Sequence, residues 1–148
     1  MYCPATPVTR AQMAVFLLKS KGIKPPAATG TKFVDVPAGY WAAAWIEELA
    51  AQGITSGCSA DSFCPEAVVT RDQMAVFLLK AKGIKPPAAT GTKFTDVPLG
   101  YWAGAWIEEL ANQGITSGCG ANNFCPEGVV TRDQMAVFLV KAFNLPLP

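Results

Sequence analysis

Residues 70–87, TRDQMAVFLLKAKGIKPP, decide the fold of this chain. They open with a capping box, in which the Thr70 hydroxyl accepts from the third backbone N–H while Gln73 reaches back to the cap. The run from Met74 to Leu79 is apolar around its whole circumference, which is typical of a helix buried on nearly all sides. Gly83 predicts the C-cap, and the Pro-Pro pair after it prevents continuation. The stretch therefore predicts a short, buried helix.

The same signal occurs three times, because the chain is an internal repeat with a step of 61 residues. The step is kept by Cys3, Cys64 and Cys125, and by Arg10, Arg71 and Arg132. We divide the chain into the second half of a repeat with its linker (1–32), a complete repeat with its linker (33–93) and a further complete repeat (94–148). The pattern starts and stops between half-repeats, so Met1 is either an interior residue of a longer protein or a start codon placed there by cloning.

A second kind of helix lies between the buried ones. Trp41, Trp45 and Leu49 recur at i, i+4 and i+8, while Glu47 and Glu48 stay polar, which describes an amphipathic helix of about three turns. The fold class predicted is therefore all-α, and the helices that start near the three repeated arginines should share the core.

Composition excludes several classes of function. Twelve Lys+Arg against 11 Asp+Glu give a net charge of +1, which does not favour nucleic-acid binding. No apolar run is long enough to insert into a membrane as a helix. With no His and no Gly-rich phosphate loop, we expect neither catalysis nor a cofactor. The start of the chain does not read as a signal peptide, so export is signalled upstream or the chain stays inside.

Two short loops carry a cysteine at each end. Cys58 and Cys64 lie within ITSGCSADSFCP (54–65), and Cys119 and Cys125 lie within its near-copy ITSGCGANNFCP (115–126). Gly, Ser and Asn allow such a loop to turn back, so a disulfide fits each pair. Zinc binding by thiolates is the alternative, although the spacing differs from that of common zinc sites.

Several spaced motifs together carry a resemblance to a known family. Their order is F-x-D-V, a Trp-bearing helix ending L-x-x-x-G-I-x-x-G, then F-x-P and T-R-x-Q-x-A-x-x-L. In the first full copy they fall on Phe33–Val36, Trp41, Ile46, Leu49, Gly53–Ile54, Gly57, Phe63, Pro65 and Thr70–Gln73, and the second copy repeats them from Phe94 to Gln134. Over nearly its whole length the chain resembles the S-layer homology repeat of bacterial cell-surface proteins.

The resemblance implies a pseudo-threefold helical bundle around a central three-helix spindle. It further implies a non-catalytic, extracellular anchor at the cell surface or in the S-layer, with grooves between repeats that bind cell-wall polysaccharide or a peptidoglycan-linked polymer, often a pyruvylated one. An oxidising location would favour the disulfides Cys58–Cys64 and Cys119–Cys125 over a metal site, with Cys3 free or capped.

The resemblance also points to glycan contacts. The family's Thr-Arg-Ala-Glu binding motif falls on the three capping boxes, so the candidates are Arg10, Arg71 and Arg132 with Gln12, Gln73 and Gln134. Arginine suits a ketal-linked pyruvate because its planar fork can hold a carboxylate in two places. Each glutamine either caps its own helix or donates to a sugar oxygen. Gln replaces Glu in all three copies and Asp replaces Ala in two, which leaves the polymer's identity open.

Two further pairs of residues have competing interpretations. Trp41 and Trp102 could stack on sugar rings, but a second Trp four residues later favours a core position. Asp35 and Asp96 could contact a hydroxyl, although an Asp before a Pro and a helix is more typical of a turn or cap. For the chain as a whole, the alternative to glycan binding is a structural module whose repeats associate with one another or with other chains.

Overall fold

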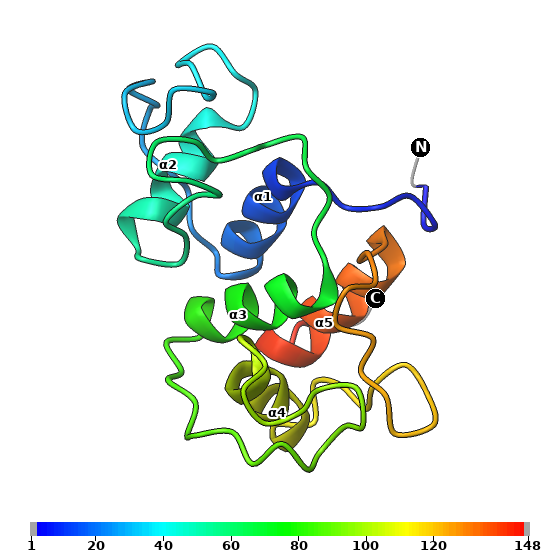
Figure 1. The fold of residues 1–148 in the computed structure, drawn as a ribbon. Coiled ribbons are helices and arrows are strands. Elements are labelled where there is room, and N and C mark those ends of the chain that lie inside the picture. The colour runs from blue at the N-terminus through cyan, green and yellow to red at the C-terminus, as the bar shows by residue number, and fades with distance from the viewer. Residues whose placement is uncertain (1–2, 147–148) are drawn as a thin grey trace. The chain divides into compact units, whose positions relative to one another are not determined.

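The computed structural model describes residues 3–146 and confirms the all-α prediction (Figure 1). Its helices are α1 (Arg10–Ser20), α2 (Ala43–Ala51), α3 (Arg71–Ala81), α4 (Gly104–Asn112) and α5 (Arg132–Phe143). Strand pairing within this range is limited to isolated bridges. None of the described helices combines the length and apolar character needed to cross a membrane.

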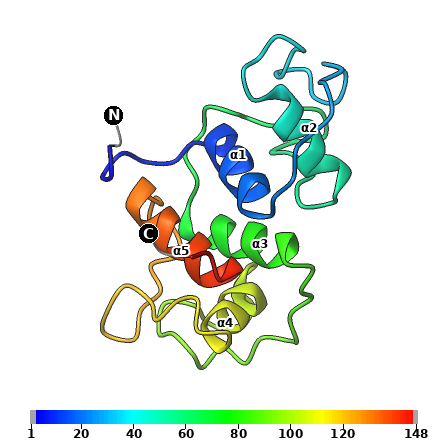
Figure 2. The same ribbon diagram turned by 180° about the vertical axis from the view of Figure 1, so that it is seen from behind.

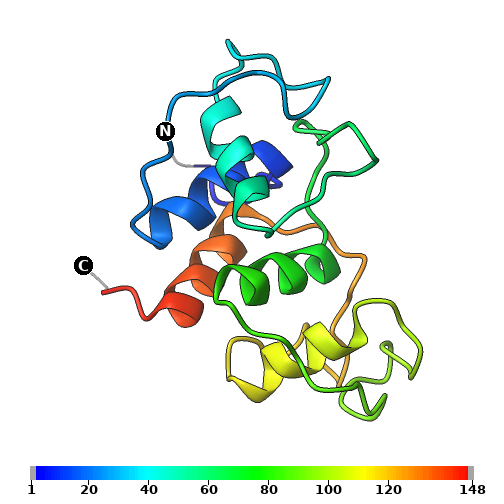
Figure 3. The same cartoon turned by 90° about the vertical axis from the view of Figure 1, so that its left-hand side faces the viewer.

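The chain forms two compact units, described here one at a time. Residues 7–69 form one unit, in which α1 packs against α2 (Figure 2). The other unit contains residues 70–146 together with the N-terminal segment 3–6, and in it α3 packs against α4 (Figure 3). Helix α5 belongs to this second unit, where Phe138 meets Arg71 of α3. The pseudo-threefold spindle of α1, α3 and α5 stays a prediction.

The long helices begin at the predicted capping boxes. In α1 the Gln12 amide N–H donates to the Thr9 hydroxyl at 3.2 Å, and the Gln12 side chain accepts from the Thr9 N–H at 3.1 Å. In α3 the side chain of Asp72 takes over part of the cap, accepting from the Thr70 hydroxyl and from the Gln73 N–H at 2.7 Å. A carboxylate in the first turn also suits the positive end of the helix.

A neighbouring loop hydrogen-bonds to the start of each long helix. The Arg10 N–H donates to the Ala67 carbonyl at 2.8 Å, and the Arg71 N–H donates to the Gly128 carbonyl at 2.8 Å. The Arg132 N–H donates to the Thr6 carbonyl at 3.0 Å. The N-terminal segment therefore accepts a hydrogen bond from the start of α5, as the segments after Cys64 and Cys125 do from the starts of α1 and α3.

Glycine ends the helices as predicted for Gly83. Its N–H donates to the Lys80 carbonyl and the Ile84 N–H to the Leu79 carbonyl, both at 2.9 Å, which is the Schellman pattern. Gly83 has φ +72°, a conformation that costs glycine little. Helix α5 ends instead at Asn144 in the left-handed region.

Two predictions about burial are wrong. Trp41 and Trp102 are not core residues, since 61 % and 62 % of their surface is exposed. Trp41 lies before α2, whose first residue is Ala43, so the helical spacing does not extend back to it. Helix α5 is not buried on all sides either, because Val137 is 52 % exposed.

Each linker is held by one glutamate of the helix that follows it. From the sequence, these glutamates could be described only as polar residues on a helix. Glu108 of α4 accepts from the Thr90 N–H at 2.8 Å, the Gly91 N–H at 2.7 Å and the Thr90 hydroxyl. Glu47 of α2 holds the other linker in the same way. Burial raises the pKa of Glu108, but the hydrogen bonds from Thr90 and Gly91 outweigh it and hold the pKa below its usual value.

Replacing Glu108 by alanine should destabilise the chain by about 2 kcal/mol, since it leaves two linker N–H groups without their acceptor. The lowered pKa means that Glu108 stabilises the fold fully above an unfolded-state pKa of about 4.3 and loses this effect as pH falls through the folded value. Urea titrations between pH 7 and 3 test this. Glu109→Ala is the control, because within residues 3–146 the Glu109 side chain accepts only from the exposed Gln113 side chain. Equal losses in the two variants would contradict the prediction.

Asp72→Ala should cost about 1–2 kcal/mol, because Asp72 is buried and also accepts from the Tyr101 hydroxyl at 2.7 Å. The matched change Asp133→Ala removes a cap at an exposed site and should cost less. Urea midpoints of the two variants give the comparison, and a larger loss for Asp133→Ala would show that the tyrosine contact adds nothing.

Candidate functional site

Arg71 is a buried residue at the bottom of a groove in the second unit. It is the first residue of α3 and only 8 % of its surface is exposed. Its Nε donates to the Phe124 carbonyl at 2.8 Å, and the guanidinium lies 4.6 Å from the centroid of the Phe124 ring. Its Nη2 has no hydrogen-bond partner among residues 3–146. A buried donor of this kind is costly without an acceptor.

The groove has a volume of about 340 Å³ and two walls. One wall is the loop Ile115–Cys119, which follows α4, and the other is the side of α5. Helix α5 contributes Gln134, Val137, Phe138 and Lys141. The groove therefore combines two cationic side chains with hydroxyl and amide groups and an apolar strip.

The surroundings of Arg71 change the pKa of its guanidinium in two opposite directions. Burial lowers the pKa of the guanidinium, and the carboxylate of Asp96 opposes that change. Arginine keeps its proton at any physiological pH. The groove thus presents a poorly hydrated cation, which favours an anionic ligand.

Asp96 has a structural role, as the sequence favoured, but its partners are distant and not those of a local turn or cap. Its two carboxylate oxygens accept from the Phe124 N–H at 2.8 Å and the Cys125 N–H at 2.7 Å. These two bonds fix the backbone on either side of the Phe124 carbonyl, which accepts the hydrogen bond from Arg71 Nε. The recurring F-x-D-V motif was a signal that the position matters, but its partners lie 28 and 29 residues away.

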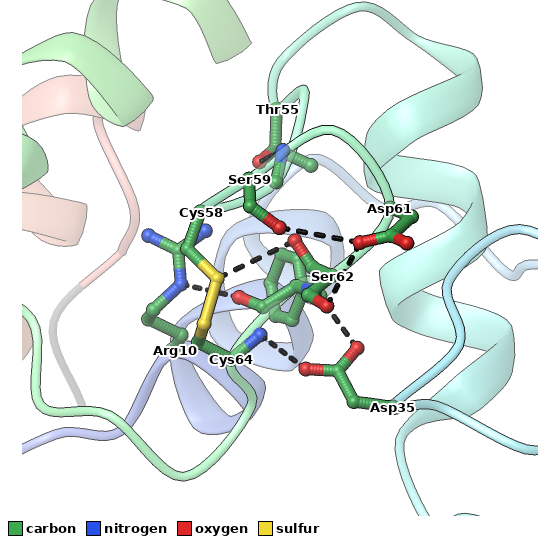
Figure 4. The surroundings of a disulfide bond; sticks show 10 residues. Arg10, Asp35, Thr55, Cys58, Ser59, Asp61, Ser62 and Cys64 are labelled. Carbon is green, nitrogen blue, oxygen red and sulfur yellow. Dashed lines mark hydrogen bonds between the residues drawn. A yellow bond between two sulfur atoms is a disulfide. The ribbon is translucent and has the colours of Figure 1, made fainter.

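The first unit repeats this arrangement around Arg10 (Figure 4). The Arg10 Nε donates to the Phe63 carbonyl at 2.8 Å, and Asp35 accepts from the N–H groups of Phe63 and Cys64. For Arg132 the corresponding aromatic position is Tyr2, which lies outside the described residues.

The glutamines are caps in all three copies. The side-chain oxygens of Gln12, Gln73 and Gln134 accept from their cap N–H groups at 3.1, 3.5 and 3.2 Å. Gln134 also lines the groove, where its amide nitrogen can donate to a ligand. The structure thus brings Gln134 to Arg71, while Trp102 is not among the residues that line this groove.

Both cysteine pairs form disulfides, Cys58–Cys64 and Cys119–Cys125, and Cys3 is free and exposed. Their sulfurs are therefore bonded to each other instead of serving as thiolate ligands. Sequence reasoning found these loops as disulfide loops but missed that residues 115–119 form a groove wall. The recurrence of GITSGC was the available signal.

Comparison with known proteins agrees with the motifs. A family model described as the S-layer homology domain matches residues 32–75 and 93–136, more than half of the chain. The chain is 32% identical over 123 residues to the S-layer protein EA1 of Bacillus anthracis, covering 83% of this chain and 14% of that protein.

Two relatives carry other names. Exoglucanase XynX of Acetivibrio thermocellus is 32% identical over 143 residues, covering 93% of this chain and 13% of that protein. The cellulosome-anchoring protein of the same organism is 31% identical over 106 residues, covering 69% of this chain and 24% of that protein. The chain thus spans at most 24% of the length of these three relatives.

Proposed function

Because this chain belongs to the S-layer homology family, we propose that it anchors a bacterial surface protein by binding an anionic cell-wall polysaccharide. The module works at the cell surface, outside the cell. The observation that carries the glycan proposal is Arg71, a buried cation whose Nη2 has no partner among the described residues and which lies at the base of an open groove.

The chemistry of the groove suits a carboxylated sugar. A carboxylate, such as that of a pyruvate ketal, would accept a charge-assisted hydrogen bond from the Arg71 guanidinium and would be attracted by Lys141 at the rim. Ser117 and Gln134 supply groups that can bond sugar hydroxyls. The exposed Trp41 and Trp102 are proposed as stacking surfaces for further sugar units.

The range of relatives supports attachment over catalysis. S-layer proteins, a glucanase and an anchoring protein each match this module over a small part of their length. Proteins with such different names would share an attachment module more readily than an active site. Whatever else the full-length protein does would then reside in other parts of it.

Sedimentation with purified cell-wall sacculi tests the proposal. We expect the chain to sediment with intact sacculi and to stay in solution when the attached polymer has been stripped. Sacculi whose carboxylates have been reduced to alcohols should bind much less, because the partner of the arginines is gone. Equal binding to intact and stripped sacculi would overturn the polysaccharide proposal, and no binding to either would favour the structural module that binds no glycan.

A further inference from the structure

The disulfide Cys119–Cys125 joins the two parts of the second unit that define the Arg71 groove. Cys119 lines the groove, at the end of the wall formed by residues 115–119. Cys125 directly follows Phe124, whose carbonyl accepts from the Arg71 Nε. We propose that this disulfide positions the groove wall for ligand binding. The inference rests on the proposed function, since it concerns the same groove.

The two ends of the disulfide loop are held unequally. At the Cys125 end, the Phe124 ring is fully buried and Asp96 accepts from two consecutive N–H groups. At the Cys119 end, the side chain is exposed, and the backbone is tied to the rest of the loop by one bond from the Cys119 N–H to the Asn123 carbonyl at 2.8 Å. Within the groove wall, Ile115 and Thr116 are buried and the Gly118 N–H donates to the Thr116 hydroxyl at 3.1 Å, so the weakly held part of the wall is its Cys119 end.

The loop conformation itself is unfavourable without a constraint. Ala121 and Asn122 have φ +51° and φ +64°, in the left-handed region, which asparagine tolerates but alanine seldom adopts. Both side chains are exposed, and the contact that reaches this tip from outside the loop comes from Thr95, whose N–H donates to the Asn122 carbonyl at 2.9 Å. A covalent tie limits the alternatives open to such a loop. Without it, the wall would have to be ordered when the ligand binds.

Figure 4 shows the equivalent loop of the first unit, where the Cys58–Cys64 disulfide stands beside Arg10. The two loops have the same length, with a sequence separation of 6 between the cysteines. Removing either disulfide should therefore change chain entropy equally. This makes the Cys58–Cys64 pair the matched control.

The experiment uses a background in which Arg10→Ala and Arg132→Ala leave only the Arg71 groove to be measured. Calorimetry with the polysaccharide purified from sacculi then gives its affinity. In this background, Cys119→Ser with Cys125→Ser should weaken binding about tenfold, which reflects the loop ordering now required on binding. Cys58→Ser with Cys64→Ser should leave the affinity unchanged while lowering the urea midpoint by a similar amount.

Reduction and reoxidation provide a second readout. A dithiol reductant gives the S–S bond two electrons and two protons, producing two thiols, and is itself oxidised to a disulfide. The reduced background protein should lose the same tenfold and regain it on reoxidation. Equal affinity in both cysteine variants would overturn this inference alone. Absence of binding by the background protein itself would overturn the role of Arg71 in the proposed function, and this inference with it.

Discussion

Replacing Arg10, Arg71 and Arg132 together by alanine is expected to weaken binding to the anionic wall polymer strongly. A charge-assisted contact contributes about 1.5–3 kcal/mol, so each groove should weaken by about ten- to a hundredfold. Grooves on one scaffold reinforce one another, so a single change can be masked in an assay on sacculi. Calorimetry with soluble polymer fragments measures the loss directly.

The control for charge is a variant with Lys24, Lys32 and Lys85 changed to alanine. It removes the same three positive charges from exposed linker positions. Its binding should stay close to that of the parent. Because Arg71→Ala also leaves the Phe124 carbonyl without its donor, a triple Arg→Lys variant is measured beside it, and helical spectra are compared. Lysine keeps the charge but not the planar fork, so it should restore part of the affinity at most. Unchanged affinity in the triple alanine variant would remove the arginines from the site.

Phe124→Ala is expected to destabilise the second unit by about 3–5 kcal/mol. The Phe124 ring is fully buried, with its centroid 5.5 Å from that of Phe94 and 4.6 Å from the Arg71 guanidinium. Truncation would leave a cavity and remove a contact of the buried cation. Urea unfolding followed by tryptophan fluorescence measures the loss.

Two other variants separate the causes. Phe124→Leu keeps most of the apolar volume but removes the aromatic face, so it should cost about 1–2 kcal/mol. Leu99→Ala removes a side chain that is 71 % exposed and should change stability by less than about 0.5 kcal/mol. If Phe124→Ala were as mild as Leu99→Ala, the ring could not be the support of the groove.

Much of the secondary structure could be predicted because its causes are local. The capping boxes at Thr9, Thr70 and Thr131 join residues three positions apart, and all three long helices begin at them. The Gly83 turn likewise depends on contacts within a few residues. The prediction failed where periodicity was extended too far, at Trp41, since a turn through Tyr40 and Ala43 starts α2 later.

The candidate site was only half predictable. Arg71 and Gln134 were both named from the repeated motif, but nothing in the sequence placed Gln134 of one copy beside Arg71 of the copy before it. Lys141, at the rim of the same groove, was not among the residues that the sequence singled out. A repeat shows which residues occupy the same position in each copy. The groove instead combines different positions from two copies, and the repeat pattern does not say which of them meet.

The amino-acid sequence by itself determined the all-α class, the starts of the long helices and the cysteine pairs, because each depends on residues a few positions apart. Only the tertiary structure decided that Arg71 bonds the Phe124 carbonyl across 53 residues and that Asp96 holds the same loop. It also decided that Glu108 fixes the linker and that Trp102 stays exposed. Periodicity specifies which face of a helix is buried, but which segment packs on that face depends on the tertiary fold, through contacts between residues far apart in the sequence.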